Sequence, residues 1–377
     1  MTKLCVFPND PLESYFKKGE IKMRYFNPKN LFSEIHVISL FDSDTIPENV
    51  KELAGTANLK IHVMGKTNLL NVRFKLNEVT NLIKKINPDV IRSFNPLLQG
   101  WVATKVGKNL GIPIIISLMG DYDRDLRYYA KKNRRWRDYL KLKYSKYVLE
   151  KFSIKNADEI IIIYEFIRKY AEDLGAKKIN LIYNKVDLSK FSPDITPKIV
   201  EKKPIIICVG RLMKEKNQEC LIHAIKNLDV ILLLVGNGPL YSELVGLVEK
   251  LDLKQKVRFE RSIPNNEINE YYTSAKIFAL PIKYGGFAIP ALEAAASGIP
   301  VILPNQKSNS KPEIIEDFAM LVENTSKAFE NAIKEVLSND LLRDSMIKRG
   351  LNTVKSINGD LMEQKEKELY LKVISKN

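Results

Sequence analysis

Cysteine, histidine and tryptophan are scarce in this chain. Its 377 residues include three Cys, three His and two Trp. Three Cys cannot all pair, and Cys5 and Cys208 lie in apolar runs, so we predict buried structural thiols in a reducing compartment. The three His stand far apart in the sequence and give little support to a His-based metal site, and we therefore predict no metal site.

Long apolar runs are also missing. No segment approaches the roughly 18 consecutive apolar residues of a membrane-spanning helix, and the opening residues MTKLCVFPND lack the apolar segment of a signal peptide. A hydrophobic content of 45% is nevertheless ample for packed cores, and the length suits two domains. We expect a cytoplasmic protein, with a peripheral position on the inner membrane face as an open alternative.

Acidic residues are outnumbered. The chain has 60 Lys and Arg against 45 Asp and Glu, a net charge of +15, and most of this excess lies in the first 190 residues. Such a basic half indicates an anionic partner. The most basic stretch, 124–151, interleaves cations with Tyr and Trp. Its central residues Arg134, Arg135, Trp136 and Arg137 would suit contact with an anionic membrane surface. Two alternatives stay open. The segment could bind nucleic acid, which we expect less, or it could be a solvated helix whose tyrosines face inward.

The first half of the sequence alternates short apolar runs with helical patterns. Strands are expected at 4–8, 34–40, 60–64, 89–94, 113–118 and 159–164, with helices between them, for example at 77–86 and 99–110. This alternation predicts an α/β fold with a parallel, doubly wound sheet. No G-x-G-x-x-G follows the first strand, so a dinucleotide-type phosphate loop is not expected there.

The second half begins a new α/β unit at Pro204, and its most informative stretch is PIKYGGFAIPALEAAASGIP at 281–300. An apolar run at 277–280 reads as a buried strand, and the glycine pair after it permits close approach of backbone to a ligand. Pro290 suits the first position of a helix. A helix N-terminus above the end of a strand favours anions, and Glu293, one turn in, can accept hydrogen bonds from paired hydroxyls.

Three segments of the second half resemble retaining GT-B glycosyltransferases of family 4, also called group 1. They are GRLMKEK at 210–216, GNGP at 236–239 and GGFAIPALEA at 285–294, in the family's order. The resemblance implies two Rossmann-like, doubly wound domains facing a cleft. It places an acceptor domain at 1–190, a nucleotide-sugar domain at 191–360, and a last helix, 361–377, that crosses back to the first domain.

The resemblance also implies an activity and its residues. The chain would move a hexose, with retention, from a nucleotide-diphosphate-sugar to an envelope glycan, a lipid-linked acceptor or a similar one. Since the nucleotide-sugar is a substrate, no cofactor is required. Arg211 and Lys216 would neutralise the diphosphate, which two cations at a strand's end can do as charge builds on the leaving group. Glu293 would bind the ribose, and the backbone of Gly286, Phe287 and Ala288 would lie near the donor phosphate or sugar.

Two positions depart from the family pattern. Gly285 stands where the family has a glutamate, and Met119 where it has a histidine near the reacting sugar. Asp121 and Asp123 are the nearest candidates for contact with an acceptor hydroxyl, with helix capping as the alternative. The departures leave two other hypotheses open: a catalytically degenerate partner subunit that binds nucleotide or membrane, and a scaffold that binds a membrane or nucleic acid through its basic helix.

Overall fold

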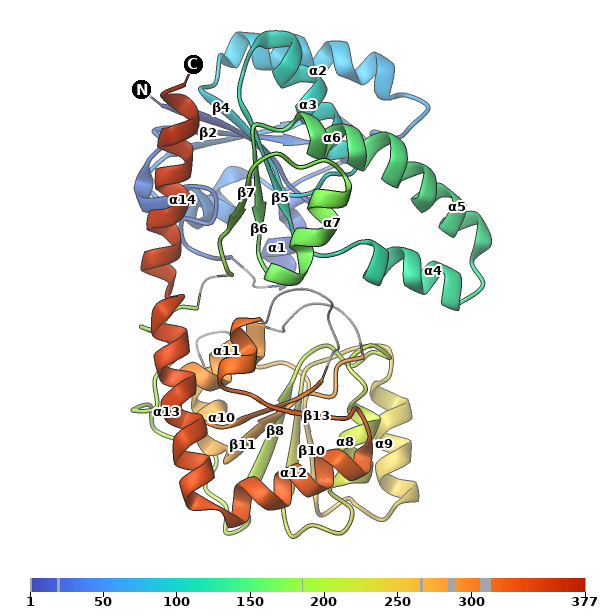
Figure 1. Ribbon diagram of the computed structural model, residues 1–377, viewed down its shortest axis with the longest axis vertical. Helices are drawn as coiled ribbons and strands as arrows, with labels where there is room; N and C mark the ends of the chain where they lie inside the picture. Colours follow the sequence, from blue (N-terminus) through green and yellow to red (C-terminus); the bar gives the residue numbers. More distant parts are fainter. Residues whose placement is uncertain are drawn as a thin grey trace. The chain divides into compact units, whose positions relative to one another are not determined.

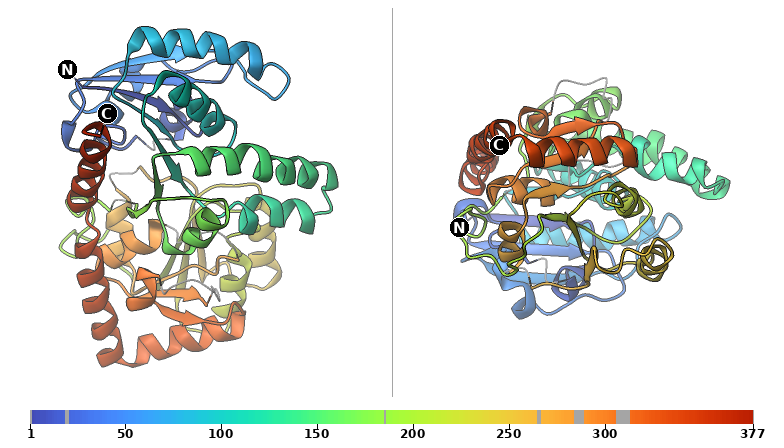
Figure 2. Two further views of the ribbon diagram at one scale, coloured as in Figure 1. Left: turned by 45° about the horizontal axis from the view of Figure 1, so that its top comes forward. Right: turned by 90° about the horizontal axis from the view of Figure 1, so that it is seen from below.

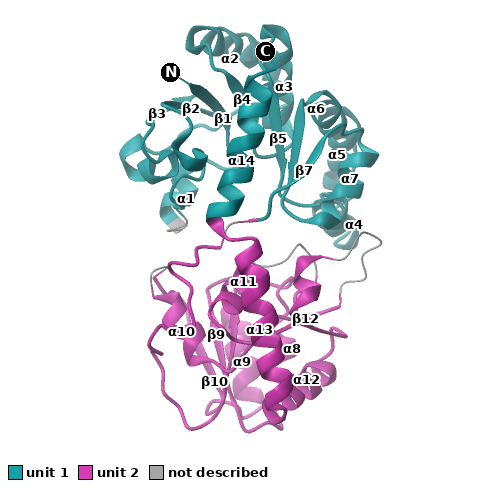
Figure 3. Cartoon of the chain, turned by 60° about the vertical axis from the view of Figure 1, so that its left-hand side comes forward, with its two compact units in different colours: residues 1–183, 360–377 teal, residues 184–359 magenta. Residues whose placement is uncertain are grey.

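The computed structural model describes residues 2–18, 21–184, 186–264, 267–283, 289–305 and 313–376. The chain forms two compact units (Figures 1 and 3). Unit 1 contains residues 1–183 and 360–377, and unit 2 contains residues 184–359. The structure thus divides the chain after Tyr183 and again after Gly359, whereas the sequence prediction divides it after residues 190 and 360.

Unit 1 is built on a parallel sheet. Its strands are apolar runs, such as the isoleucines at 114–116, that are buried on both faces as parallel sheets require. The strands are β1 (Lys3–Phe7), β2 (Glu34–Ser39), β3 (Asn58–Val63), β4 (Val90–Ser93), β5 (Ile114–Leu118), β6 (Glu159–Ile162) and β7 (Ile179–Leu181). They lie in the order β3-β2-β1-β4-β5-β6-β7, and every neighbouring pair is parallel.

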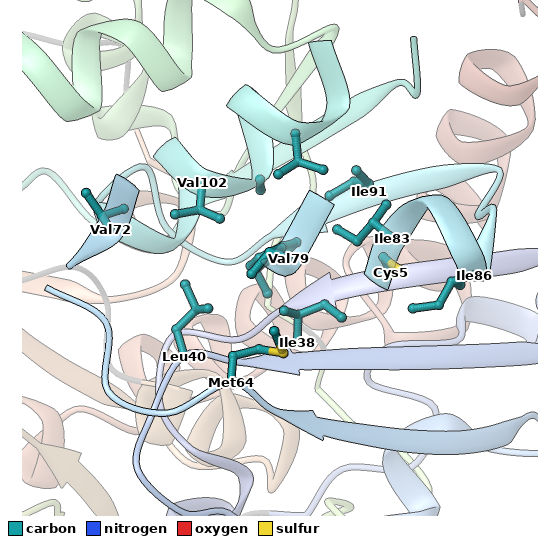
Figure 4. Packing of buried hydrophobic residues seen from close by; sticks show 13 residues of the cluster. Cys5, Ile38, Leu40, Met64, Val72, Val79, Ile83, Ile86, Ile91 and Val102 are labelled. Atoms are coloured by element: carbon teal, nitrogen blue, oxygen red, sulfur yellow. The ribbon is translucent and has the colours of Figure 1, made fainter. Parts of the chain in front are cut away.

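Helices connect these strands. They are α1 (Leu12–Lys18), α2 (Val72–Ile86), α3 (Leu98–Leu110), α4 (Tyr128–Lys132), α5 (Trp136–Ser145), α6 (Lys151–Asn156), α7 (Arg168–Asp173) and, at the end of the chain, α14 (Gly359–Ile374). Val79 and Ile83 of α2 pack with Cys5, Ile38 and Ile91 of the sheet (Figure 4). The apolar face of α2 therefore covers the first strands, and its end at Asn87 turns the chain into β4.

Unit 2 repeats the same plan. Its strands are β8 (Ile205–Val209), β9 (Ile231–Val235), β10 (Val257–Glu260), β11 (Ile277–Ala279), β12 (Val301–Pro304) and β13 (Met320–Val322). Its helices are α8 (Gln218–Ala224), α9 (Tyr241–Lys250), α10 (Ile268–Ser274), α11 (Ile289–Ala296), α12 (Ser326–Ser338) and α13 (Asp340–Ser356). The strands are parallel in the order β10-β9-β8-β11-β12-β13. The α/β fold with two doubly wound parallel sheets is confirmed.

Two strands are not predicted from the sequence. β7 and β13 each have three residues, and all of them are only half-buried at one edge of their sheet. Strands this short carry neither a long apolar run nor a clear alternation, so pairing to a neighbour is what defines them.

The basic segment is not the single helix that the sequence suggested. It forms a hairpin, in which α4 and α5 are the two arms and Arg134 at the turn has a φ of 53°. A π-helical turn lies at the base of each arm, at Asp123–Arg127 and Lys146–Glu150. The break follows from Asn133 and Arg134: the first is a poor helix former and the second adopts the left-handed conformation.

The last helix is anchored to unit 1 by a buried ion pair. The guanidinium of Arg92 on β4 contacts the Glu366 carboxylate of α14, and it donates to the Tyr370 hydroxyl at 2.9 Å and to the Ser117 hydroxyl at 3.0 Å. Arg92 is 5% exposed and Glu366 is 4% exposed. Charges this deep are tolerated because each is paired and hydrogen-bonded.

Two histidines that are distant in sequence meet on β2 and β3. Nδ1 of His36 lies 3.0 Å from Nε2 of His62, and their rings stack. Burial lowers the pKa of His36, against the opposing effect of its hydrogen bond to Glu34, and burial and His36 lower the pKa of His62. The remaining charged neighbours are Lys3 and Lys60, which also disfavour a charged imidazole.

This pair predicts a loss of stability in mild acid. A histidine whose folded pKa is depressed takes up its proton more readily when unfolded, so stability is present above the ordinary histidine pKa of about 6.5 and falls below it. Unfolding at pH 7 and at pH 5.5, above the titration range of Glu34, should show this loss. The His62→Gln variant should show a smaller loss, and an equal loss in the variant would contradict the assignment.

The structure also describes the cysteines, the length and apolarity of the helices, and the grouping of metal-ligating side chains. Cys5, Cys208 and Cys220 are free and buried, so the buried thiols are confirmed. Within the described ranges, no helix is both long enough and apolar enough to cross a bilayer. Among these same residues, no group of three or more His, Cys, Asp or Glu side chains is placed to hold a metal ion.

Candidate functional site

The predicted diphosphate and ribose residues of unit 2 follow the two strands between which its strand order reverses. The chain runs from β8 outward to β10, then returns to β11 on the other side of β8. Ligands of open α/β sheets bind at the carboxyl ends of the strands at such a switch point. Arg211 follows β8, and Glu293 lies on α11, which follows β11. The two residues thus come from the strands that flank the switch point.

The loop that carries Arg211 is held by close backbone contacts with the loop after β9. The N–H of Leu212 donates to the carbonyl of Asn237 at 3.0 Å. A Cβ on Gly236, whose φ is +136°, would lie 2.3 Å from the carbonyl oxygen of Gly210. Only glycine permits this approach. The glycines of the GRLMKEK and GNGP segments therefore serve to bring two strand ends together.

Arg211 and Lys216 both lie at the end of β8, in different environments. The Arg211 side chain is exposed, and its carbonyl accepts a hydrogen bond of 3.0 Å from Nε2 of the buried Gln218. Lys216 is half-buried. A Cβ built on Gly210 would lie 3.8 Å from Cδ of Lys216, so the aliphatic part of this lysine passes over Gly210. The side chain of Lys216 therefore lies beside the residue that directly follows β8.

One amide side chain joins three loops of this region. Nδ2 of Asn324 donates to the carbonyls of Pro281 and Ile282, both at 3.2 Å. Its Oδ1 accepts from Nδ2 of Asn217, at 3.3 Å, and Asn217 has a φ of 56°. Asn324 therefore links the segment that follows Lys216 to the segment that leaves β11, and it positions both.

Glu293 is half-buried on α11 and is oriented by a tyrosine. The hydroxyl of Tyr272, a fully buried residue of α10, donates to Oε2 of Glu293 at 3.0 Å. Burial, followed by the Glu293 carboxylate, raises the pKa of Tyr272 well above its ordinary value. The phenol thus remains a hydrogen-bond donor throughout the physiological pH range and holds one carboxylate oxygen in place.

Tyr272→Phe tests this orienting role. We expect the affinity for the donor nucleotide to fall about tenfold, because a hydrogen bond to a charged acceptor is lost and the carboxylate can turn away. Calorimetric titration with nucleotide measures the effect. Tyr271→Phe, on the neighbouring half-buried tyrosine, is the matched control. Equal affinities in wild type and Tyr272→Phe would contradict the role.

The other predicted donor residues cannot be compared with the structure. Gly286, Phe287 and Ala288, together with Gly285, lie outside the described residues. Their contact with the donor stays a prediction. The structure does describe Ile289 and Pro290, which begin α11 as expected from the proline at a first-turn position.

Asp121 interacts within its own turn of unit 1, and Asp123 also pairs with the base of the other hairpin arm. Oδ1 of Asp121 accepts from the backbone N–H of Asp123 at 2.9 Å, and burial raises the pKa of Asp121. Asp123 pairs with Arg127, at 2.5 Å, and with Lys146. These are the contacts of a turn and of an ion-pair cluster, as the capping alternative anticipated for Asp121. Contact of either with an acceptor stays a prediction.

Arg134, Arg135, Trp136 and Arg137 occupy the end of the α4–α5 hairpin, and all four are exposed. Arg135 forms an ion pair with Asp138 at 2.6 Å. The hairpin extends away from the sheet of unit 1 (Figure 1). The cations are thus presented to solvent rather than packed on the body of the unit.

Sequence reasoning missed Tyr272, Asn324 and a pair of asparagines in unit 1. Nδ2 of Asn95, which follows β4, donates to Oδ1 of Asn9, which follows β1, at 3.0 Å. These strands flank the switch point of unit 1. Polar residues directly after two predicted strands were a usable signal for Asn9 and Asn95. No local pattern could have paired Tyr272 with Glu293.

Two family descriptions together match most of the chain. The family described as glycosyl transferases group 1 matches residues 194–353, and glycosyltransferase family 4 matches residues 33–190. The chain belongs to the group 1 glycosyltransferases. The two parallel-sheet units correspond to the GT-B fold of this family.

Several relatives of this group 1 glycosyltransferase are known. An N-acetylgalactosaminyltransferase of Campylobacter jejuni that acts on N-acetylgalactosamine-N,N'-diacetylbacillosaminyl-diphospho-undecaprenol is 32% identical over 175 residues, 45% of this chain and 47% of the relative. The Escherichia coli UDP-Gal:alpha-D-GlcNAc-diphosphoundecaprenol alpha-1,3-galactosyltransferase is 26% identical over 319 residues, 78% of each chain. The chain thus spans only about half the length of the first of these relatives.

A solved structure supports the fold. The Anabaena protein HepE in complex with UDP superposes with a TM-score of 0.72 at 13% identity, over 98% of this chain and 99% of HepE. At this level of identity the likeness establishes the GT-B architecture.

Proposed function

We propose that this chain transfers a hexose from a nucleotide-diphosphate-sugar to a lipid-linked glycan. The observation that carries the proposal is the placement of two cations and a carboxylate around the switch point of unit 2. Arg211 and Lys216 suit a diphosphate, and Glu293, oriented by Tyr272, suits the paired hydroxyls of a ribose. The polyprenyl-diphosphate acceptors in the names of two relatives support the acceptor class.

The reaction balances without a metal or a further cofactor. The acceptor hydroxyl forms a bond to the anomeric carbon while the bond from that carbon to the diphosphate breaks, and the hydroxyl proton passes to the departing diphosphate oxygen. Negative charge grows on the diphosphate in the transition state. Arg211 and Lys216 stabilise it there more than in the ground state, which lowers the barrier. Retention of the anomeric configuration belongs to the proposal.

Calorimetry with UDP, GDP and their sugars tests the donor site. One nucleotide-sugar should bind the wild type, and Glu293→Ala should bind it at least tenfold more weakly, because hydrogen bonds to a charged carboxylate are lost. Glu249→Ala, on the exposed surface of α9, is the control. Circular dichroism would establish that both variants fold.

Measurement of turnover then distinguishes an active transferase from a non-catalytic partner subunit. Transfer of the sugar to polyprenyl-diphosphate glycans, or its slow hydrolysis, supports the enzyme. Binding without either reaction would overturn the transferase proposal in favour of a non-catalytic partner subunit. Absence of nucleotide binding in the folded wild type would overturn the donor site itself.

A further inference from the structure

Helix α5 presents a line of large apolar side chains to solvent. Trp136, Leu140 and Tyr144 are 54%, 64% and 54% exposed, and Tyr147, in the π-helical turn that follows α5, is 59% exposed. Their spacing of four, four and three residues places them on one helix face. An amphipathic helix normally buries such a face, yet Ser145 is the only residue of α5 that is buried. The face is turned away from the unit's own core.

The same hairpin carries many exposed cations. All of the following hairpin side chains are exposed: Lys131, Lys132, Arg134, Arg135, Arg137, Lys141 and Lys143. Arg135 among them pairs with Asp138, as described above. A helix with an aromatic and aliphatic face bordered by Lys and Arg has the composition of a segment that lies in the interface of an anionic bilayer.

A second exposed apolar segment, the 66–75 tip, lies at the same edge of the sheet as the hairpin. In the segment 66–75, Leu69, Leu70 and Phe74 are 53%, 90% and 80% exposed, and Lys66 and Arg73 beside them are exposed as well. This tip follows β3, and the hairpin follows β5, so both leave the carboxyl edge of one parallel sheet. Figures 1 and 2 show the start of α2 and the hairpin projecting toward the same side of unit 1.

The two arms of the hairpin are joined at their bases. Nη1 and Nη2 of Arg127, at the base of α4, donate to both carboxylate oxygens of Glu150, at 2.9 and 2.7 Å, and Glu150 is fully buried. Nη1 of Arg127 also donates to the carbonyl of Leu142 at 3.0 Å. This double pairing links the base of α4 to the π-helical turn that follows α5.

We propose that unit 1 docks on an anionic bilayer through the α5 face and the 66–75 tip together. This docking face deepens the proposed function, on which it rests for the lipid-linked acceptor. Aliphatic side chains such as Leu70 and Leu140 gain from burial among acyl chains but gain nothing from bases or phosphates, which favours a bilayer over nucleic acid. The cationic border complements anionic headgroups, and two separated contacts fix the orientation of the unit at the surface.

Vesicle sedimentation tests the docking face. The wild type should bind vesicles of phosphatidylcholine mixed with phosphatidylglycerol, and should bind phosphatidylcholine alone much more weakly. The double variants Trp136→Ser/Tyr144→Ser and Leu70→Ser/Phe74→Ser should each bind the anionic vesicles at least about tenfold more weakly, because two large apolar side chains are lost from the contact. Leu341→Ser, at a residue of unit 2 that is 85% exposed, is the control and should bind as the wild type does.

Tryptophan fluorescence reports the contact of α5 with the bilayer directly. In a Trp101→Phe background Trp136 is the only tryptophan, and its emission should shift to the blue with anionic vesicles. Unchanged vesicle binding in both double variants would overturn the docking face. So would tight binding of the wild type to single-stranded nucleic acid that depends on Trp136. A wild-type dimer that the double variants no longer form would overturn it as well. Nucleotide-sugar binding in solution should be equal in all variants, so a failure of docking is distinguishable from a failure of the donor site.

Discussion

Lys216→Ala is expected to lower kcat/KM for the nucleotide-sugar by about 100- to 1,000-fold, the usual effect of removing one group that stabilises developing charge. The half-buried side chain of Lys216 passes over Gly210, which directly follows β8. Since charge on the diphosphate grows as the sugar departs, most of the loss should fall in kcat rather than in KM. Steady-state kinetics with the donor identified by calorimetry measure the effect.

Lys214→Ala is the matched control for this experiment. Lys214 is a lysine of the same loop, and its side chain is exposed. We expect its removal to change kcat/KM by less than about threefold, as solvated charges contribute little. Equal losses in the two variants would mean that the loop acts only through its overall charge, and an unchanged kcat/KM in Lys216→Ala would remove this lysine from the reaction.

Glu366→Ala is expected to destabilise unit 1 by about 3–5 kcal/mol. The substitution leaves Arg92, at 5% exposed, as an uncompensated charge in the core. Removing one partner of a buried ion pair costs more stability than replacing both partners by apolar residues. Because two units need not unfold together, native-state hydrogen exchange of the β4 and β5 amides is a better measure than a global transition. Glu368→Ala, on the exposed face of α14, should change the exchange free energy by less than about 0.5 kcal/mol.

A double variant separates the charge from the packing. Arg92→Met with Glu366→Leu removes both charges and keeps apolar volume, and it should recover most of the stability lost in Glu366→Ala. If the double variant is as unstable as Glu366→Ala, the loss comes from packing of α14 and not from the unpaired guanidinium.

Much of the fold was predictable because its elements have strong local signals. Runs such as the isoleucines at 114–116 and 205–207 are too apolar for an exposed strand, and turns such as Asn87-Pro88 separate helix from strand. β7 and β13 were missed because a strand of three half-buried residues is defined by the neighbour to which it pairs. The hairpin was mistaken for one helix because a left-handed residue at Arg134 has no distinctive sequence signal.

The candidate site divides in the same way. Arg211, Lys216 and Glu293 could be predicted as donor residues because each belongs to a short motif whose glycines and proline have local geometric causes. The partners that orient them were not found. Tyr272 lies 21 residues from Glu293, and Asn324 lies 107 residues from Asn217, so only folding brings these pairs together.

The sequence by itself determined the α/β class, the parallel sheets, the presence of two cations after β8 and the excess of positive charge, because periodicity, turn residues and ionisable side chains act over a few residues. The tertiary structure alone decided the placement of charge and of apolar surface. It buried Arg92 with Glu366, stacked His36 on His62, and left Trp136 and Leu70 in solvent. Burial depends on which distant elements cover a residue, and no local pattern contains that information.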